Sequence, residues 1–367
     1  MNSAPTPRDR PLKIAILSPY PVFPFAAELG LTAPSHENNA TWTVTLAHHL
    51  AALPNTEVHV LTETTSLPAT RTLVHGQLHL HFLKAPARFK TLTFWQLDRR
   101  RLHAALAELQ PDLVHGQGIE NQYGYAALTS PFPNLITIHG LASLSRIARG
   151  DPRLGRGNIL EWFERECLRR ARNIVIVNPF IAQHLRLDPQ RYRLFPIPNP
   201  INELFLAPAD APRQDNLILA TGWVDRLKGH DVLLAAVAEL RRRGRAVSLI
   251  IAGPVGSPAH LARLHDLIET EKLDVTFAEF LPPAELAALM RRATLLVHPS
   301  RHDNSPMTIA EAQASGLPVI ASRVGGVPFM IRDGETGLLF ESENTTELAA
   351  KMLRLLDDPA ARQRLSQ

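Results

Sequence analysis

Short apolar segments alternate along the chain with longer segments in which apolar residues recur at helical spacing. The short segments are residues 13–17, 58–62, 78–83, 113–115, 135–138 and 174–177, followed by 217–220, 248–252, 275–278, 295–298 and 318–321. Among them, 78–83 alternates apolar residues with His79 and His81, which is the pattern of a half-buried strand. Strands that are apolar throughout and are joined by helices are typical of parallel sheets buried on both faces. Two such series predict an α/β fold with two Rossmann-like, doubly wound domains.

A segment with repeated prolines and few apolar residues separates the two series. It spans residues 208–216 and is typical of a linker between domains. We therefore predict an N-terminal domain over residues 1–207 and a C-terminal domain over residues 217–367. Open parallel sheets bind ligands beyond the carboxyl ends of their strands, so a cleft between the two domains is the expected site.

Composition excludes several other classes of protein. The 367 residues include 39 Lys and Arg and 35 Asp and Glu, a net charge of +4 that suits an anionic ligand without indicating a nucleic-acid binder. The single cysteine, Cys167, excludes a disulfide framework, and we interpret it as a packed helical residue. No apolar run approaches the roughly 18 residues of a membrane span, and residues 1–10 lack the core of a signal peptide. We therefore expect a cytoplasmic protein.

The first strand of the second series is followed by a glycine and two cations at the start of a helix. These residues are Gly222, Arg226 and Lys228. Cations at a helix N-terminus suit a diphosphate, although the same pattern is compatible with a solvated turn. Gly253 ends the next strand and lets a ligand approach the backbone, but an ordinary turn uses glycine as well.

A second polar loop leads from the strand at 295–298 into a helix predicted over 307–314. The loop and the start of the helix contain Asp303, Asn304, Ser305, Pro306, Met307 and Thr308, and Glu311 lies inside the helix. Amides of a first helical turn can face an anion, while carboxylates accept hydrogen bonds from sugar hydroxyls. The alternative for Glu311 is an ordinary solvated charge.

This half of the chain resembles the donor-binding half of retaining glycosyltransferases of family 4, which have the GT-B fold. The resemblance rests on Asp303 and Glu311, which have seven residues between them, and it extends over residues 217–356. Other matching segments are 316–320, 325–326 and 333–339 and, more loosely in the first half, 137–140 and 197–200. The fold class that this implies is two Rossmann-like domains that face an interdomain cleft.

The resemblance implies roles for particular residues. Glu311 would bind the ribose of the donor nucleotide, Asp303 would contact the donor sugar, and Arg226 with Lys228 would neutralise the leaving diphosphate. His139 would lie near the donor sugar and the acceptor, or would be a half-buried histidine at the end of a strand. The donor site would also include the remaining glycines and loop residues, namely Gly222, Gly253, Asn304, Ser305, Pro306, Met307 and Thr308.

The chain departs from the family pattern at several positions. The family often has a glutamate where this chain has Asp303, and an arginine where it has Trp223. The usual glycine pair after the first strand is missing, so Gly30 and Asn39 are only weak candidates for a loop that approaches phosphates or acceptor. The chain ends at Gln367, where the family commonly continues through a further helix.

The activity implied by the resemblance is retaining, metal-independent hexosyl transfer. The donor would be a UDP- or GDP-sugar, and the acceptor a hydroxyl of a glycan or lipid-linked molecule in bacterial polysaccharide or glycoconjugate biosynthesis. The chain has no Asp-x-Asp triplet, so we expect no metal at the diphosphate and no cofactor. The alternatives are a nucleotide-sugar epimerase of the same fold, whose motifs are missing, and a non-catalytic nucleotide-sugar-binding protein.

A basic stretch with aromatic residues lies in the first half, at residues 88–90, 94–95 and 99–101. Such segments bind anionic lipid surfaces, which would place the protein at the inner face of the cell membrane. A loop followed by a solvated helix face gives the same pattern, and both interpretations stay open.

Overall fold

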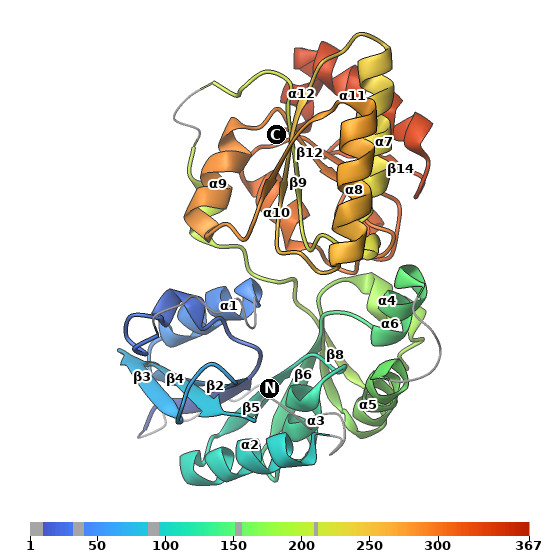
Figure 1. The fold of residues 1–367 in the computed structure, drawn as a ribbon. Coiled ribbons are helices and arrows are strands. Elements are labelled where there is room, and N and C mark those ends of the chain that lie inside the picture. The colour runs from blue at the N-terminus through green and yellow to red at the C-terminus, as the bar shows by residue number, and fades with distance from the viewer. Residues whose placement is uncertain (1–9, 32–39, 87–94, 151–155, 209–211, 367) are drawn as a thin grey trace. The chain divides into compact units, whose positions relative to one another are not determined.

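The computed structural model describes residues 10–31, 40–86, 95–150, 156–208 and 212–366, which form two compact units (Figure 1). The first unit comprises Met1–Ser143, Pro152–Val177 and Ala182–Pro200. The second comprises Leu144–Asp151, Asn178–Ile181 and Ile201–Gln367. No helix among the described residues is both long enough and apolar enough to cross a membrane.

The first unit contains an eight-stranded sheet in the order β3-β4-β2-β1-β5-β6-β7-β8. Its strands are β1 (Leu12–Leu17), β2 (Thr56–Thr64), β3 (Arg71–His75), β4 (Leu78–Lys84), β5 (Leu113–Gln117), β6 (Asn134–Ile138), β7 (Asn173–Ile176) and β8 (Arg193–Pro196). The helices over the same part of the chain are η1 (Phe23–Phe25), α1 (Thr41–Ala51), α2 (Gln96–Leu109), α3 (Gln122–Thr129), α4 (Ala142–Arg149), α5 (Arg156–Arg170) and α6 (Pro179–His184). All neighbouring strands are parallel except β3 and β4.

The second unit contains a six-stranded parallel sheet in the order β11-β10-β9-β12-β13-β14. Its strands are β9 (Leu217–Thr221), β10 (Ser248–Ala252), β11 (Asp274–Ala278), β12 (Leu295–His298), β13 (Val319–Ser322) and β14 (Leu338–Phe340). Its helices are η2 (Glu203–Leu206), η3 (Arg226–Lys228), α7 (His230–Arg242), α8 (Pro258–Glu271), α9 (Pro283–Arg292), α10 (Met307–Ala314), η4 (Val327–Phe329), α11 (Thr345–Asp357) and α12 (Pro359–Leu365).

Strand β9 shows why each sheet is covered on both faces. Leu217 and Leu219 are buried with residues of α9 and α10, whereas Ile218 and Ala220 are buried with residues of α7, α8 and α11. Alternate side chains of a strand point to opposite faces, so a strand that is apolar at every position needs helices on both sides. Figure 1 shows this arrangement of helices around the sheet of the second unit. The doubly wound α/β fold predicted from the sequence is confirmed.

Three strands were not predicted from the hydrophobic pattern. Strand β3 is exposed at four of its five positions, so its sequence carries no burial signal, and it pairs antiparallel to β4 across a tight turn at Gly76. Strand β8 is exposed or half-buried throughout. Strand β14 has three residues, too few to show a period.

Residues 201–207, which the sequence assigns to the first domain, pack within the second unit. The ring of Phe205 in η2 is buried in the same cluster as residues of α9 and α10. Part of the linker is also held there, because Arg213 donates hydrogen bonds to the carbonyls of Met290 and Gly316, each at 2.8 Å. Residues 209–211 of the linker lie outside the described residues.

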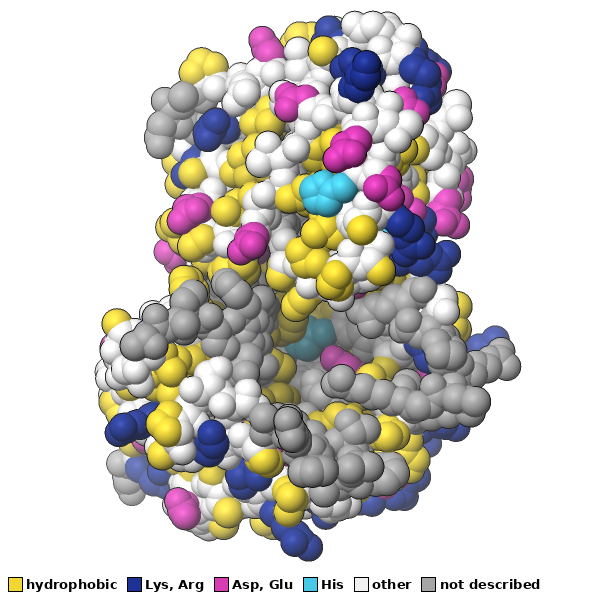
Figure 2. Space-filling view, viewed as in Figure 1, with side chains coloured by type: hydrophobic (Ala, Val, Ile, Leu, Met, Phe, Trp, Pro, Cys, Tyr) yellow, Lys and Arg dark blue, Asp and Glu magenta, His cyan; other side chains and the backbone are white. Residues whose placement is uncertain are grey.

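The basic, aromatic stretch of the first half is only partly described, since residues 88–90 and 94 lie outside the described residues. Trp95 is 5% exposed and packs edge-on against Phe163, so its ring belongs to the core. Arg101 is paired with the buried carboxylates of Glu63 and Asp98. These two residues are therefore structural. Figure 2 shows lysine and arginine side chains dispersed over the face that it draws.

Candidate functional site

Most candidate residues of the second unit lie on the segments that follow two neighbouring strands, β9 and β12. The strand order reverses between these two strands, because β10 and β11 continue on one side and β13 and β14 on the other. Adjacent loops diverge at such a reversal and leave room for a ligand beyond the carboxyl edge of the sheet. The topology therefore brings together two motifs about 75 residues apart in sequence, as in the contact between Lys228 and Asp303.

Lys228 and Asp303 form an ion pair at this edge. Lys228 Nζ donates a hydrogen bond to Oδ2 of Asp303 at 2.7 Å, and the two side chains are 21% and 16% exposed. His298 Nε2 lies 3.3 Å from the same oxygen. Burial opposes ionisation of Asp303, but Lys228 and His298 outweigh it and hold the pKa of the carboxyl below its usual range. Asp303 is therefore ionised and bound to a cation near neutral pH.

Arg301 organises the loop that carries Lys228. Its guanidinium donates to both carboxylate oxygens of Asp231, at 2.9 and 2.8 Å, and to the backbone carbonyl of Arg226 at 2.6 Å. The backbone N–H of Arg301 donates to the carbonyl of Leu227 at 2.8 Å. A planar guanidinium suits such a multiple contact better than a lysine does. The sequence analysis missed this role, although Arg301 directly follows the Pro-Ser pair after β12.

Arg226 itself is exposed at the start of η3. The turn is capped by Asp225, whose side chain accepts a hydrogen bond from the N–H of Lys228 at 3.2 Å. Trp223 is 46% exposed on the same loop, at the position where the family pattern has an arginine. The loop thus presents one exposed arginine, one lysine held by Asp303 and an exposed indole.

The segment from Asn304 to Thr308 leads into α10. Asn304 and Pro306 are buried, and Ser305, Met307 and Thr308 are half-buried. Pro306 is the N-cap residue and no side chain caps the helix, so the first-turn amides have no side-chain partner from within α10. The hydroxyl of Thr308 is hydrogen-bonded to that of Thr221, which ties the start of α10 to the end of β9.

A glycine turn holds the backbone of this segment from the other side. Gly326 N–H donates to the carbonyl of Asp303 at 3.0 Å. A Cβ on Gly325 would lie 2.0 Å from that same oxygen, and φ is +51° there, so only glycine is compatible with the contact. The Gly325–Gly326 pair seen in the sequence therefore positions Asp303.

Glu311 lies in α10 and is 8% exposed, so the alternative of a solvated charge is wrong. Burial raises the pKa of its carboxyl to about 7. A glutamate in this state exchanges its proton near neutral pH. Its charge, and hence its strength as a hydrogen-bond acceptor, can respond to a ligand that donates hydrogen bonds.

Gly222 and Gly253 allow two strand ends to touch. The N–H of Gly222 donates to the carbonyl of Ala252 at 2.9 Å. A Cβ on Gly253 would lie 2.1 Å from the carbonyl oxygen of Gly222, and φ at Gly253 is +154°. In this structure Gly253 thus serves a close backbone contact with the start of the loop that follows β9.

Substitution of Gly253 by alanine is expected to lower stability by about 1–3 kcal/mol, because it strains the backbone and displaces the Gly222 carbonyl. A loss of about 1 kcal/mol lowers the melting temperature by roughly 2–4 °C in a protein of this size. The matched control is Gly334→Ala, where φ is also positive but no heavy atom lies within 4 Å of the added Cβ. Equal melting temperatures for the two variants would contradict the steric argument.

His139 belongs to the first unit and follows β6. Its Nε2 lies 2.6 Å from Gln117 Oε1, an acceptor, so this nitrogen carries the proton. The Gln117 amide in turn lies 3.0 Å from His115 Nε2. Burial, with a smaller contribution from His115, lowers the pKa of His139 to about 3. The ring is therefore neutral near pH 7 and suited to hydrogen bonding rather than to accepting a proton from an alcohol.

The two weak candidates of the first loop remain predictions. Gly30 is exposed at a turn with φ of +69°, with no other heavy atom within 4 Å of where a Cβ would lie. Asn39 lies outside the described residues. Cys167 is fully buried and burial raises the pKa of its thiol, which agrees with its interpretation as a packed residue.

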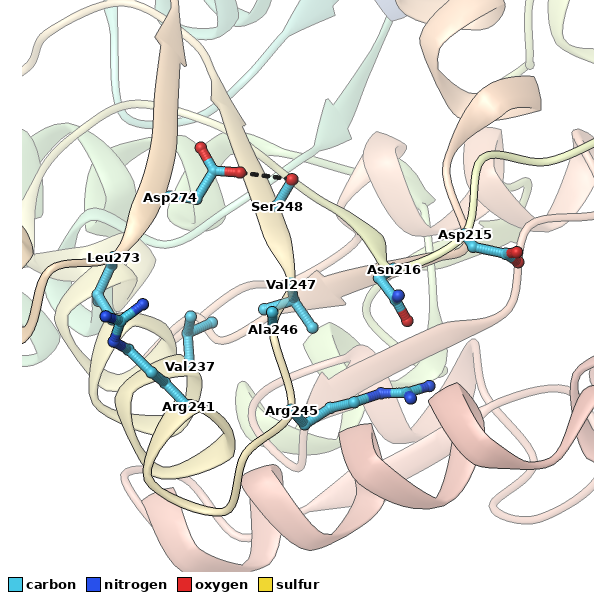
Figure 3. Close-up of a pocket in the computed structure, with 10 residues that line it drawn as sticks. All are labelled: Asp215, Asn216, Val237, Arg241, Arg245, Ala246, Val247, Ser248, Leu273 and Asp274. Carbon is cyan, nitrogen blue, oxygen red and sulfur yellow. Dashed lines mark hydrogen bonds between the residues drawn. The ribbon is translucent and has the colours of Figure 1, made fainter.

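A pocket of about 290 Å³ lies elsewhere in the second unit (Figure 3). Ser248 and Asp274, which begin β10 and β11, line it and are hydrogen-bonded to each other. The pocket is therefore at the amino ends of the strands. The candidate loops follow the carboxyl ends, so this pocket is no part of the site built above.

Comparison with known proteins identifies the class and then the family. Residues 40–203 match the model described as Glycosyltransferase Family 4, and residues 203–367 match Glycosyl transferases group 1. A D-inositol 3-phosphate glycosyltransferase of Streptomyces bingchenggensis is 30% identical over an alignment of 404 residues, which covers 97% of this chain and 84% of that protein.

Solved structures share the fold. Sucrose-phosphate synthase (tll1590) from Thermosynechococcus elongatus matches with a TM-score of 0.75 at 22% identity, over 98% of this chain and 92% of that one. Anabaena Alr3699/HepE in complex with UDP and glucose matches with a TM-score of 0.69 at 16% identity, over 97% and 93%. Two doubly wound units of this kind define the GT-B class of glycosyltransferase. Within that class, the chain belongs to the family of glycosyl transferases group 1, with a Family 4 N-terminal region.

Proposed function

We propose that this protein transfers a sugar from a nucleoside diphosphate sugar to a hydroxyl group, with retention of configuration and without a metal at the diphosphate. The single observation that carries the proposal is the placement of Lys228 and Asp303 on two loops, and of Glu311 on the helix α10 that follows the second loop, at the strand-order reversal of a sheet. A nucleoside diphosphate sugar has a diphosphate that joins a ribose to the sugar. A cation beside one carboxylate, with a second carboxylate on the next helix, offers a group for each of these three parts.

Each group has a proposed task. Lys228, exposed Arg226 and the first-turn amides of α10 offset the charge that develops on the leaving diphosphate. Asp303 accepts hydrogen bonds from the donor sugar, and Glu311 accepts them from the ribose. His139, neutral and with its proton on Nε2, binds a hydroxyl of the sugar or acceptor through Nδ1.

The proposed reaction exchanges one bond at the anomeric carbon for another. The bond from that carbon to the diphosphate oxygen breaks, and the acceptor oxygen bonds to the carbon on the same face. The acceptor proton passes to the leaving diphosphate, so the products are a nucleoside diphosphate and a glycoside. No protein nucleophile is required, and the carboxylates act as binding groups rather than as the acid and base of a glycosidase.

Two acceptor classes follow from different observations. A glycan or lipid-linked hydroxyl is the expectation from the sequence. An inositol phosphate is the second candidate, because the relative that aligns with 97% of the chain is a D-inositol 3-phosphate glycosyltransferase. UDP-glucose is the first donor to test, since Alr3699/HepE, which shares the fold, was crystallised with UDP and glucose.

The experiment is release of nucleoside diphosphate from UDP- and GDP-sugars, measured with and without each acceptor class. Acceptor-dependent release with formation of a glycoside supports the proposal and names the acceptor. Binding without release with any acceptor would favour a non-catalytic nucleotide-sugar-binding protein. Conversion of the donor to its epimer would favour an epimerase.

A further inference from the structure

Three histidines and a glutamate lie close together on two strands of the first unit, and none of them is assigned to sugar transfer. Glu57 and His59 lie on β2, and His79 and His81 lie on β4. The two strands are parallel neighbours in which His59 is opposite His79, so these side chains leave the same face of the sheet. Glu57 and His79 are each the second residue of their strand. The cluster is therefore near the amino ends of the strands, whereas His139 follows the carboxyl end of β6.

The nitrogen and oxygen atoms of three of these residues converge on one point. His59 Nε2 lies 2.9 Å from Glu57 Oε1, and His79 Nε2 lies 3.4 Å from the same oxygen. One ligand atom from each residue lies within 4.8 Å of the other two. Two ligands of a tetrahedral zinc ion, with bonds of about 2.0–2.2 Å, are separated by about 3.4 Å. We propose that Glu57, His59 and His79 bind one zinc-type divalent transition-metal ion.

His81 and Thr72 complete the arrangement around His59. His59 Nδ1 lies 3.0 Å from His81 Nε2, and His81 Nδ1 lies 3.1 Å from the hydroxyl of Thr72. When Nε2 of His59 binds the metal, its proton is on Nδ1 and is donated to His81 Nε2. His81 then carries its own proton on Nδ1 and donates it to Thr72. Hydrogen bonds of this kind orient metal-binding histidines and fix their tautomer.

Without a metal the same atoms form the reverse chain. Nε2–H of His59 donates to Glu57, Nε2–H of His81 donates to His59, and the Thr72 hydroxyl donates to His81. The metal-free and metal-bound forms therefore differ by the positions of protons on two rings. Neither form leaves a polar atom of His59 without a partner.

The ligand set determines the class of ion. Two imidazoles and one carboxylate favour zinc and its neighbours, whereas calcium and magnesium prefer ligand sets made of oxygen. His59 is 4% exposed, but the side chains of Glu57 and His79 are 24% and 23% exposed, so an ion can reach the site from solvent. Three protein ligands leave the fourth position for water. The ion would join β2 to β4 and stabilise the first unit.

The test uses the full-length chain, freed of metal with a chelator and titrated with ZnCl₂ by calorimetry and with CoCl₂ by visible absorption. We expect one ion per chain, a tetrahedral cobalt spectrum, and a melting temperature raised by several degrees at saturating zinc. His79→Gln and Glu57→Gln are each expected to weaken binding at least tenfold. The matched control is His75→Gln on neighbouring β3, which lies 3.3 Å from Glu28 and should bind zinc as the unaltered chain does.

His81→Phe separates a bound ion from adventitious binding to surface histidines. It removes no ligand but takes away the acceptor for His59 Nδ1, so about a tenfold to hundredfold loss of zinc affinity is expected. Absence of a tetrahedral cobalt spectrum in the unaltered chain would overturn the proposal, whatever the folding of the variants. Zinc affinity that is unchanged in both His79→Gln and Glu57→Gln would also overturn it. Neither outcome bears on sugar transfer.

Discussion

Substitution of Lys228 by alanine is expected to lower kcat/KM for sugar transfer by about a hundredfold to a thousandfold. This is the range observed when one group that stabilises developing negative charge is removed from an active site. The Lys228 ammonium is held 2.7 Å from Asp303 on the loop after β9, where the proposed diphosphate leaves. The measurement is the initial rate of nucleoside diphosphate release with saturating acceptor and varied donor.

A second effect must be separated from the loss of charge stabilisation. Without Lys228, Asp303 is a largely buried carboxylate that has lost its main cation, so its pKa rises and the fold loses stability. The double variant Lys228→Ala/Asp303→Asn removes this stranded charge. We expect it to recover much of the melting temperature but none of the activity, because Asp303 is also proposed to bind the donor sugar. Recovery of transfer in the double variant would show that Lys228 acts only on stability and that Asp303 is not required for transfer.

Lys351→Ala is the matched control for removal of a lysine. Lys351 lies on α11 in the same unit and pairs with Glu347 at 3.4 Å, on a helix that carries none of the proposed site. Its loss should change kcat/KM by less than twofold, since exposed pairs contribute little. A wild-type rate for Lys228→Ala, or an equal loss in both variants, would contradict the proposed role.

Most strands could be predicted from the sequence because both faces of each sheet are buried. Segments such as 217–220 and 249–252 are apolar at every position because helices cover both sides, and this leaves a strong signal. Strand β3 has no such signal, since four of its five residues are exposed. It is held by backbone pairing to β4, which the hydrophobic pattern does not record.

The contacts within the site depend on strand order, which one sequence does not reveal. Lys228 and Asp303 were both candidates, but their ion pair exists because β9 and β12 are neighbours. Arg301 had no assigned role, because its partners Asp231 and Glu343 are close only after folding. Trp95 was a candidate for membrane contact on sequence alone, and its burial against Phe163 depends on the tertiary fold.

Glu311→Gln is expected to stabilise the protein at pH 8 and to weaken nucleotide binding. Burial raises the pKa of Glu311 to about 7, above the usual value of 4.5 that it has when unfolded. A group whose pKa is raised on folding contributes stability at low pH and loses it as pH rises through the folded pKa. Above pH 7 the ionised, buried carboxylate therefore costs up to about 3 kcal/mol, which glutamine avoids.

The difference in stability between the unaltered protein and Glu311→Gln is expected to depend on pH. Melting temperatures of the two proteins should nearly coincide at pH 5 and separate at pH 8, where the variant melts several degrees higher. Gln313→Glu is unsuitable as a control, because the side-chain amide of Gln313 donates a hydrogen bond to the carbonyl of Met330 at 3.3 Å. Glu285→Gln on α9 is suitable, since that side chain is exposed, and its effect on the melting temperature should be small at both pH values.

Nucleotide binding should change in the opposite direction. Hydrogen bonds to an ionised carboxylate contribute about 1 kcal/mol more than neutral ones, so Kd for UDP should rise roughly fivefold to tenfold in Glu311→Gln at pH 8. The diphosphate of UDP also titrates, but it does so equally for both proteins. The ratio of their Kd values therefore isolates Glu311, and it should fall towards one below pH 6.

Proton release gives the most direct test of the assignment. Ribose hydroxyls that donate to Glu311 stabilise its ionised form and lower its pKa, so binding of UDP at pH 7 should release up to about half a proton per chain that the variant does not release. Calorimetry in two buffers of different ionisation enthalpy measures this difference. The assignment is contradicted if both proteins release the same number of protons and the ratio of their Kd values does not depend on pH. The ribose would then bind away from Glu311, and the burial of this carboxyl would lower stability without contributing to binding.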